Sequence, residues 1–280
     1  MNFKRIQWIF FLAFLLFDII IACSLLVEKR FIITNTQGSS SAVILKEMKN
    51  DSISFNNLSR KKGTGFYISG KRSTNNGELE EKSSKLRGQD THFSNNSLVS
   101  DFNAGIGINP SSPNVRLDRV VNNNRQIALG SHYTYNPFLS TKRTIVYTQM
   151  VEGKPVMSTD GQIRFHVSAN NEVTGYTQTY LESAKPLRPA TNTISQKTAV
   201  IWLYKHNQIP NNSRIEWAKL GYTRLLTTNT QDLNVYIPTW VIEIKTKNSG
   251  AVERTSINAF NSTIMKGTAT SVDTEALNQE

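Results

Sequence analysis

A predominantly apolar run over residues 6–27 constrains this chain more than any other feature. Its 22 residues would form a helix about 33 Å long, which is enough to cross the hydrocarbon core of a bilayer. Lys4 and Arg5 precede the run, and positive charge favours the cytoplasmic side. We therefore expect a cytoplasmic tail over residues 1–5, a transmembrane helix over residues 6–27 and an extracellular remainder. The sequence therefore predicts a single-pass protein of the cell membrane.

The sequence around Cys23 leaves a second mode of anchoring open. Residues 20–23 (IIAC) resemble a bacterial lipobox, in which the cysteine is acylated and becomes the new N-terminus. A cleavable signal peptide needs a small-residue exit site, but residues 25–27 (LLV) continue the apolar run beyond the only candidate. An uncleaved transmembrane helix is therefore the preferred interpretation.

Asp18 is the one acidic or basic residue within the apolar run. A charged group at the centre of a membrane helix costs about 2.5–3.5 kcal/mol on insertion scales, so it normally faces protein. Helical spacing predicts a stripe that packs on a partner helix, with Asp18 hydrogen-bonded across the interface. A protonated Asp18 tolerated by its apolar neighbours is the alternative. The expected contact residues are Phe11, Phe14, Leu15, Asp18, Ile21, Ala22 and Leu25.

Beyond the apolar run the chain is moderately basic. It carries 30 Lys and Arg residues against 20 Asp and Glu residues, a formal charge of +10. This sign suits an anionic wall polymer or anionic lipid headgroups as partners, although simple solubility explains it equally well. The basic residues lack the interleaved aromatic residues of a surface that stacks nucleic-acid bases. Nucleic-acid binding is therefore not expected.

Hydrophobic periodicity predicts an α+β fold with two helix-plus-antiparallel-sheet modules. In the first module, residues 28–115, we expect a helix over 40–49, a strand over 65–69 and long polar loops over most of 70–113. In the second, residues 116–280, we expect a helix from Ser195 to before Pro210. Its expected strands cover residues 143–151, 163–167, 173–181, 221–226, 235–245 and 254–260, with tight turns at 153–155, 160–161 and 170–171.

Motifs of catalytic and metal sites are missing from the sequence. We find no G-x-S-x-G elbow, no H-E-x-x-H helix, no phosphate-binding glycine loop and no S-x-x-K motif. Cys23 lies within the apolar run, and the four histidines are widely separated, which argues against a histidine-rich metal site. We therefore expect no enzyme activity, no catalytic residues, no metal and no cofactor.

Several short segments, taken in their order along the chain, resemble a known family. They are the N-terminal residues 1–10 and 14–19, Gly153 with Pro155, residues 176–181 (YTQTYL), 203–204 (LY), 221–222 (GY), 238–240 (PTW) and 257–261 (INAFN). Together they resemble the YycI (WalI) family, most weakly over residues 70–116.

The resemblance implies a function that the residues alone do not indicate. YycI proteins are membrane-anchored extracytoplasmic regulators in low-GC Gram-positive bacteria. With the sister protein YycH, they contact the sensor histidine kinase YycG (WalK) and adjust a two-component system, YycFG (WalRK), that controls cell-wall metabolism. The family contact is attributed largely to transmembrane helices, and the family has no catalytic residues. The alternative is an exported wall-polymer-binding or lipid-binding protein, or lipoprotein, without a kinase partner.

Overall fold

The computed structural model describes residues 7–8, 11–19, 41–227 and 233–265. These belong to two compact units, residues 1–47 and residues 48–280, which are considered separately. In the first unit, residues 11–19 form a helix whose large apolar side chains are exposed. Among the residues described, none of the helices is both long and apolar enough to cross a bilayer.

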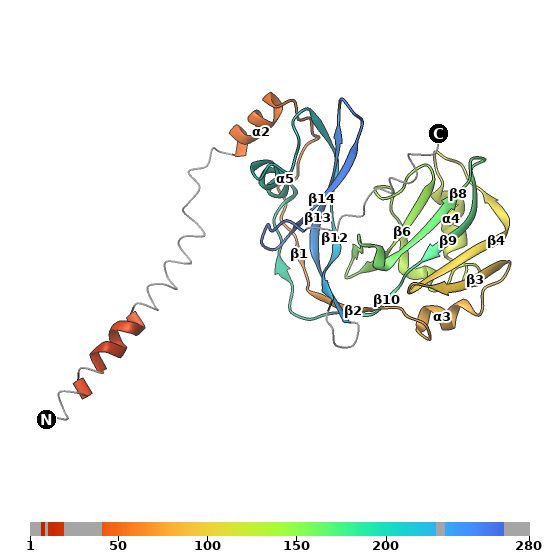
Figure 1. Ribbon diagram of the computed structural model, residues 1–280, viewed down its shortest axis with the longest axis horizontal. Helices are drawn as coiled ribbons and strands as arrows, with labels where there is room; N and C mark the ends of the chain where they lie inside the picture. The colour runs from red at the N-terminus through yellow and green to blue at the C-terminus, as the bar shows by residue number, and fades with distance from the viewer. Residues whose placement is uncertain (1–6, 9–10, 20–40, 228–232, 266–280) are drawn as a thin grey trace. The chain divides into compact units, whose positions relative to one another are not determined.

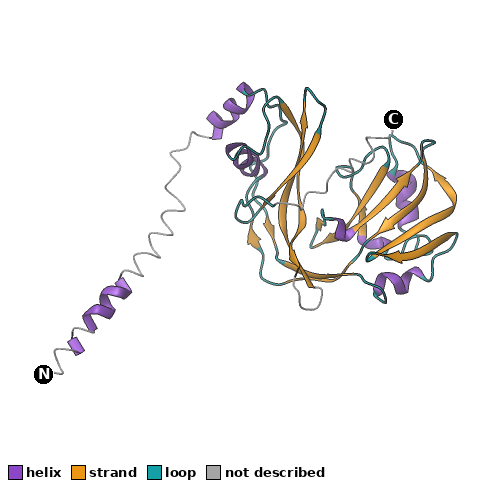
Figure 2. Cartoon of the chain, viewed as in Figure 1, coloured by secondary structure: helices purple, strands orange, loops and turns teal. Residues whose placement is uncertain are grey.

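The second unit contains two antiparallel sheets, as expected for an α+β chain in which strands predominate (Figures 1 and 2). The first sheet has the strand order β10-β2-β13-β12, with β14 also paired to β13. We call it the outer sheet. Its strands are β2 (Ile68–Arg72), β10 (Leu181–Pro186), β12 (Ser213–Thr227), β13 (Leu233–Thr246) and β14 (Val252–Asn258).

The second sheet has the strand order β3-β4-β9-β8-β6-β5, with β7 paired to β6. We call it the inserted sheet, because all of its strands lie in the chain between β2 and β10. They are β3 (Gln89–Ser94), β4 (Ser97–Gly107), β5 (Tyr133–Tyr135), β6 (Thr144–Val151), β7 (Lys154–Pro155), β8 (Gln162–Val167) and β9 (Glu172–Gln178).

The chain leaves the outer sheet and returns to it at one place. Strands β2 and β10 are antiparallel neighbours, with Arg72 opposite Leu181. Immediately beyond this pair, the Ser73 N–H donates a hydrogen bond to the Tyr180 carbonyl oxygen at 2.9 Å. Residues 73–180 therefore form an inserted module whose two ends lie side by side within the outer module.

Few helices accompany the sheets. Helix α5 (Gln196–Lys205) begins where expected, because the Ser195 side chain caps it by accepting a hydrogen bond from the Thr198 N–H. The others are α2 (Ser41–Asn50), α3 (Glu78–Ser83), α4 (Asn114–Val121) and the 3-10 turns η1 (Gly130–His132) and η2 (Thr159–Gly161). A short pair of strands, β1 (Thr64–Gly65) with β11 (Thr191–Asn192), completes the fold.

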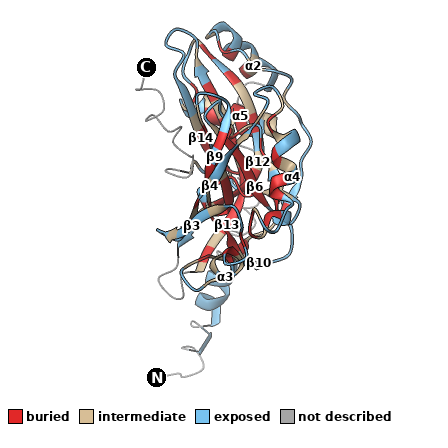
Figure 3. Ribbon diagram, turned by 90° about the vertical axis from the view of Figure 1, so that its right-hand side faces the viewer, coloured by how far each residue is buried: buried red, intermediate tan, exposed pale blue. Residues whose placement is uncertain are grey.

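An aromatic core lies within the inserted module. Tyr147, Phe165 and Tyr176 are almost fully buried, with ring centroids 5.8 Å apart between the first two and 5.6 Å apart between the last two. Leu117 and Val121 of α4 join the same cluster. Figure 3 shows that buried residues follow the strands of both sheets, so each sheet has an ordinary packed interior.

The structure confirms most of the expected strands and corrects the reading of residues 70–113. The alternating segments expected around residues 143–181 and 221–260 are strands β6, β8, β9, β12, β13 and β14. The long loops expected over 70–113 are wrong, because β3 and β4 pair there as a hairpin. Its two-residue turn, Asn95 and Asn96, has positive φ angles of 50° and 59°, which matches the right-handed twist of the strands.

The strands are not divided between two consecutive modules, residues 28–115 and 116–280, as the sequence predicted. Strands from before and after residue 115 share both sheets, since β2 pairs with β13 in one and β4 pairs with β9 in the other. Instead, the inserted module, residues 73–180, is nested within the outer module, and neither matches the expected bounds. Sequence periodicity identifies strands but carries no information on which distant strands pair.

Candidate functional site

The site with the most distinctive chemistry is a buried carboxylate between the two sheets. Asp160 belongs to η2, immediately before β8, and its side chain is 1% exposed. The Thr179 hydroxyl fixes this turn locally. It donates to the Thr159 carbonyl oxygen at 2.5 Å and accepts a hydrogen bond from the Gln162 N–H at 3.0 Å. The turn therefore presents Asp160 from the inserted module in a fixed orientation.

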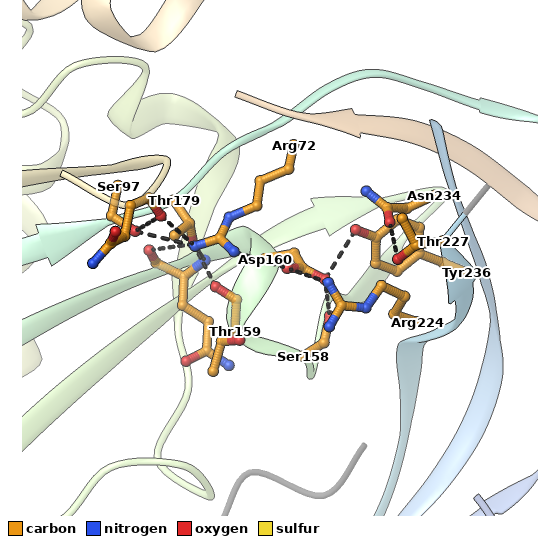
Figure 4. Close-up of polar contacts among 12 residues, drawn as sticks. Arg72, Ser97, Ser158, Thr159, Asp160, Thr179, Arg224, Thr227, Asn234 and Tyr236 are labelled. Atoms are coloured by element: carbon orange, nitrogen blue, oxygen red, sulfur yellow. Dashed lines mark hydrogen bonds and ion pairs between the residues drawn. The ribbon is translucent and has the colours of Figure 1, made fainter. Parts of the chain in front are cut away.

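Donors from three strands of the outer sheet surround the carboxylate (Figure 4). Its Oδ1 lies 3.3 Å from Nη1 of Arg224 on β12 and 3.9 Å from Nη1 of Arg72 on β2. Its Oδ2 accepts a hydrogen bond from the Tyr236 hydroxyl on β13 at 3.0 Å, and another from the Ser158 hydroxyl at 3.4 Å. Both oxygens are thus satisfied, mainly by side chains of the other module.

Two guanidinium groups lie close enough to the buried Asp160 carboxylate to pair with it. Removing an ionised group from water is costly unless partners compensate, and two guanidinium groups do so for Asp160. Burial, followed by the negative charge of Asp160, raises the pKa of Tyr236. The hydroxyl of Tyr236 therefore stays protonated and keeps donating to the carboxylate at neutral pH.

Arg72 extends the site into the inserted sheet. Its Nη2 donates to the Ser97 hydroxyl at 3.1 Å and to the Asn95 carbonyl oxygen at 3.3 Å, both at the β3–β4 hairpin. One side chain of β2 thus contacts both the hairpin and the η2 turn. Both arginine side chains are partly exposed, that of Arg72 to 28% and that of Arg224 to 43%, although the Arg72 Nε is itself buried.

An apolar contact adjoins the charged one. Val151 and Val156 of the inserted module pack with Ile68, Tyr222 and Tyr236 of the outer sheet. We call these contacts, together with the Asp160 cluster, the junction.

The backbone of β12 approaches the inserted module closely at the junction. The Met157 N–H donates to the Tyr222 carbonyl oxygen at 2.7 Å. Gly221 permits this approach, because a Cβ there would lie 2.6 Å from the Pro155 oxygen and 2.4 Å from the Met157 Cγ. A larger residue at position 221 would therefore force the two modules apart.

The side chains of the junction form a structural contact between the two modules. Both carboxylate oxygens of Asp160 already accept hydrogen bonds or ion pairs, so the group is occupied as a structural acceptor. In the described part of the chain, His, Cys, Asp and Glu residues form no group of three that could hold a metal ion. The arrangement can fix one module against the other.

The residues expected to contact a membrane partner are only partly described. Phe11, Phe14, Leu15 and Asp18 lie in the helix over residues 11–19 and are exposed. Their spacing of three, one and three residues places them on one side of that helix. Ile21, Ala22 and Leu25, together with Lys4 and Arg5, lie outside the described residues. The membrane contact stays a prediction.

A comparison with known protein families assigns the chain to one of them. A family model described as "YycI: YycI protein" matches residues 33–260, which is most of the chain. The chain belongs to the YycI family. This is a regulatory, non-catalytic family, and membership implies a regulator of the YycFG two-component system and association with the YycG and YycH system.

Two solved structures show remote likeness to the chain. The chain is similar to an uncharacterized protein from Eubacterium rectale ATCC 33656, with 9% identity, 78% of this chain and 91% of that chain covered, and a TM-score of 0.48. It is also similar to the Bacillus megaterium YpeB C-terminal domain, with 10% identity, 81% and 94% covered, and a TM-score of 0.35. No curated protein sequence matches.

Three of the segments that carry the YycI resemblance lie at or beside the junction. Pro155 belongs to β7, whose neighbour Met157 bonds to Tyr222, and Gly221 gives it room. Pro238 lies opposite Tyr222 in the register of β12 and β13. Asp160 lies in the same place, but the sequence reading treats it only as part of a tight turn. Its Asp-Gly pair is a turn signal, and nothing local reveals partners 64 and 76 residues away.

Proposed function

We propose that this chain is a membrane-anchored extracytoplasmic regulator that associates with the YycG (WalK) sensor kinase and YycH through its N-terminal helix. In this role it modulates two-component signalling for cell-wall homeostasis. The observation that carries the proposal is the match of the YycI family model to residues 33–260. The anchor over residues 6–27 and its orientation rest on the apolar run and on Lys4 and Arg5.

The mechanism we propose is a shift between kinase states. A bound helix changes the activity of its partner only if it makes better contacts in one state than in the other. Asp18 supplies such a contact, because a hydrogen bond across a membrane interface is lost when the partner helix rotates or slides. Phe11, Phe14 and Leu15 supply packing on the same side of the helix.

Substitution of Asp18 tests the membrane contact. We expect Asp18→Leu to lower copurification of YycG with the full-length protein by about 10-fold, because an interhelical hydrogen bond contributes about 1–2 kcal/mol. Expression of the genes controlled by the kinase would change in the same cells. The control is Leu16→Ala, on the opposite side of the helix, which should leave both readouts unchanged.

Two results would count against the proposal. If Asp18→Leu leaves association and gene expression as in the wild type, the stripe is not the contact. If Leu16→Ala weakens association as strongly, the effect comes from insertion of the helix in general. Membrane fractionation of each variant distinguishes loss of insertion from loss of the partner.

A further inference from the structure

Two segments of the outer module carry basic residues without any acidic ones. Residues 52–77 and residues 183–215 each contain five Lys and Arg residues and no Asp or Glu. In a chain with 21 acidic residues among 280, such segments invite a functional explanation if they also lie together in space.

The structure brings the two segments side by side. The Lys197 N–H donates to the Ser59 carbonyl oxygen at 3.0 Å, and the Thr193 N–H donates to the Gly63 carbonyl oxygen at 2.9 Å. Further along, β1 pairs with β11, and the Leu187 N–H donates to the Tyr67 carbonyl oxygen at 2.7 Å. The segments therefore run antiparallel from Ser59 to Tyr67, a distance of about 26 Å for extended chain.

Basic side chains line this stretch, and we call them the basic stripe. All are exposed except Lys197, which is half-buried. Within the described residues none of them takes part in an ion pair. The basic stripe consists of Arg60, Lys61, Lys62, Lys185, Arg188 and Lys197.

Two neighbouring parts of the chain do not neutralise the basic stripe. Residues 233–242 of β13, and residues 255–265, which comprise the end of β14 and the segment after it, contain no acidic residue. Lys71 and Arg72 are left out of the stripe, because Lys71 lies opposite Glu182 in the strand register and Arg72 is committed to Asp160. The uncompensated charge thus follows the stretch between Ser59 and Tyr67 and, with Lys185, reaches the level of Ser69.

One member of the stripe is held in place by aromatic rings. The Arg188 guanidinium lies 5.5 Å from the centre of the Tyr67 ring. Tyr67 is itself stacked on Phe260, with ring centroids 4.8 Å apart. A guanidinium that rests on a ring keeps its N–H edge free for paired hydrogen bonds to a phosphate. Arg188 is therefore already oriented for an anionic ligand.

We propose that the basic stripe binds a linear phosphodiester polymer. A single phosphate group is too small to contact charges spread over about 26 Å, whereas an extended polyanion can follow the line of the two segments. Arginine and lysine both bind phosphate, arginine through paired donors and lysine as a point charge. This ligand lies beyond the proposed kinase contact, which involves the N-terminal helix alone.

A pair of matched charge reversals tests the proposal. The stripe variant is Lys61→Glu with Lys62→Glu, and the control is Lys142→Glu with Arg143→Glu in the exposed connection before β6. Both change the net charge by the same amount. Binding of labelled poly(glycerol phosphate) to the full-length protein in a nonionic detergent is followed by fluorescence anisotropy over a range of salt concentrations.

We expect the dissociation constant to rise by about 10-fold or more for the stripe variant and by less than about 3-fold for the control. Each lost phosphate contact should also reduce the slope of log K against log salt by about 0.7. A second variant, Arg188→Gln with Lys197→Gln, should weaken binding in the same direction. It keeps the test usable if the first variant folds poorly by circular dichroism.

Three outcomes would overturn the proposal. Equal weakening by the stripe and control variants would mean that only net charge matters. Equally tight binding of polyglutamate would remove the preference for phosphate. Tighter binding to vesicles containing phosphatidylglycerol than to the polymer would assign the stripe to a membrane surface. Copurification of YycG with the stripe variant is measured separately, so failure here leaves the kinase proposal intact.

Discussion

Asp160 concentrates more long-range polar contacts than any neighbouring residue of its turn. Arg72, Arg224 and Tyr236 reach it from three strands of the outer sheet, while its own backbone belongs to the inserted module. A buried charge of this kind rarely adds much net stability, but removing one partner leaves the others uncompensated. Asp160 therefore specifies how the two modules meet more than it strengthens the fold.

Replacing Asp160 tests this role at the residue scale. We expect Asp160→Asn to lower the free energy of unfolding by about 2 kcal/mol, because it removes charge-assisted hydrogen bonds from partly exposed arginines. Urea denaturation of the wild type and the variant measures the change. Asp90→Asn, at an exposed position of β3, is the control and should change stability by less than about 0.5 kcal/mol. Equal effects of the two substitutions would contradict the assigned role.

At the scale of elements, the junction depends on the β6–β7 hairpin lying against β12. Gln149 of β6 adds a second connection, since its side chain bonds both the N–H and the carbonyl oxygen of Leu181 at the start of β10. Pro238 of β13 lies at a position where β13 changes its neighbouring strand. It lies between the last residue paired with β2, Tyr236, and the first paired with β14, Thr239. A residue without an N–H is tolerated where the neighbouring strand changes.

Gly221 is the position at which the hairpin contact is most sensitive. We expect Gly221→Ala to destabilise the protein by about 1–3 kcal/mol, because the added Cβ would overlap Met157 and the Pro155 carbonyl. Thermal unfolding of both proteins provides the measurement. The control is Gly107→Ala, where a Cβ would meet nothing within 4 Å. An unchanged melting temperature for Gly221→Ala would mean that the two modules separate without cost.

Local patterns predicted individual elements well and their assembly poorly. Alternation identified β6, β8 and β13, and Ser195 identified the start of α5, because these signals involve residues close in sequence. The β3–β4 hairpin was missed, although Asn95 and Asn96 are typical of its turn. The nesting and the contacts of Asp160 could not be predicted, because both depend on pairing between residues far apart in the chain.

At the scale of the whole molecule, buried tyrosines make stability depend on alkaline pH. Burial is the largest cause of a raised pKa at every one of them, and for Tyr180 it raises the pKa to about 12. The residues affected are Tyr133, Tyr147, Tyr176, Tyr180, Tyr222 and Tyr236.

We therefore expect the free energy of unfolding to fall as the pH rises above about 10. The unfolded chain then releases tyrosine protons that the folded protein retains, so each such residue removes up to about 1.4 kcal/mol per pH unit. Urea titrations between about pH 8 and pH 11 measure this slope. Tyr180→Phe should make the fall of the free energy of unfolding with pH shallower, by the contribution of one tyrosine. A flat profile over this range would show that the tyrosines ionise equally in both states.

The neighbouring ends of the inserted module also determine how the protein responds to pulling. Tension applied between residue 48 and residue 265 reaches β2 and β10 before it reaches residues 73–180, because the Ser73–Tyr180 contact closes that segment into a loop. The paired strands must unzip, starting from Ile68 and Pro186, before any force enters the loop. The inserted sheet is thus mechanically shielded. A stretched molecule would lengthen first by separation of β2 and β10 in the outer sheet.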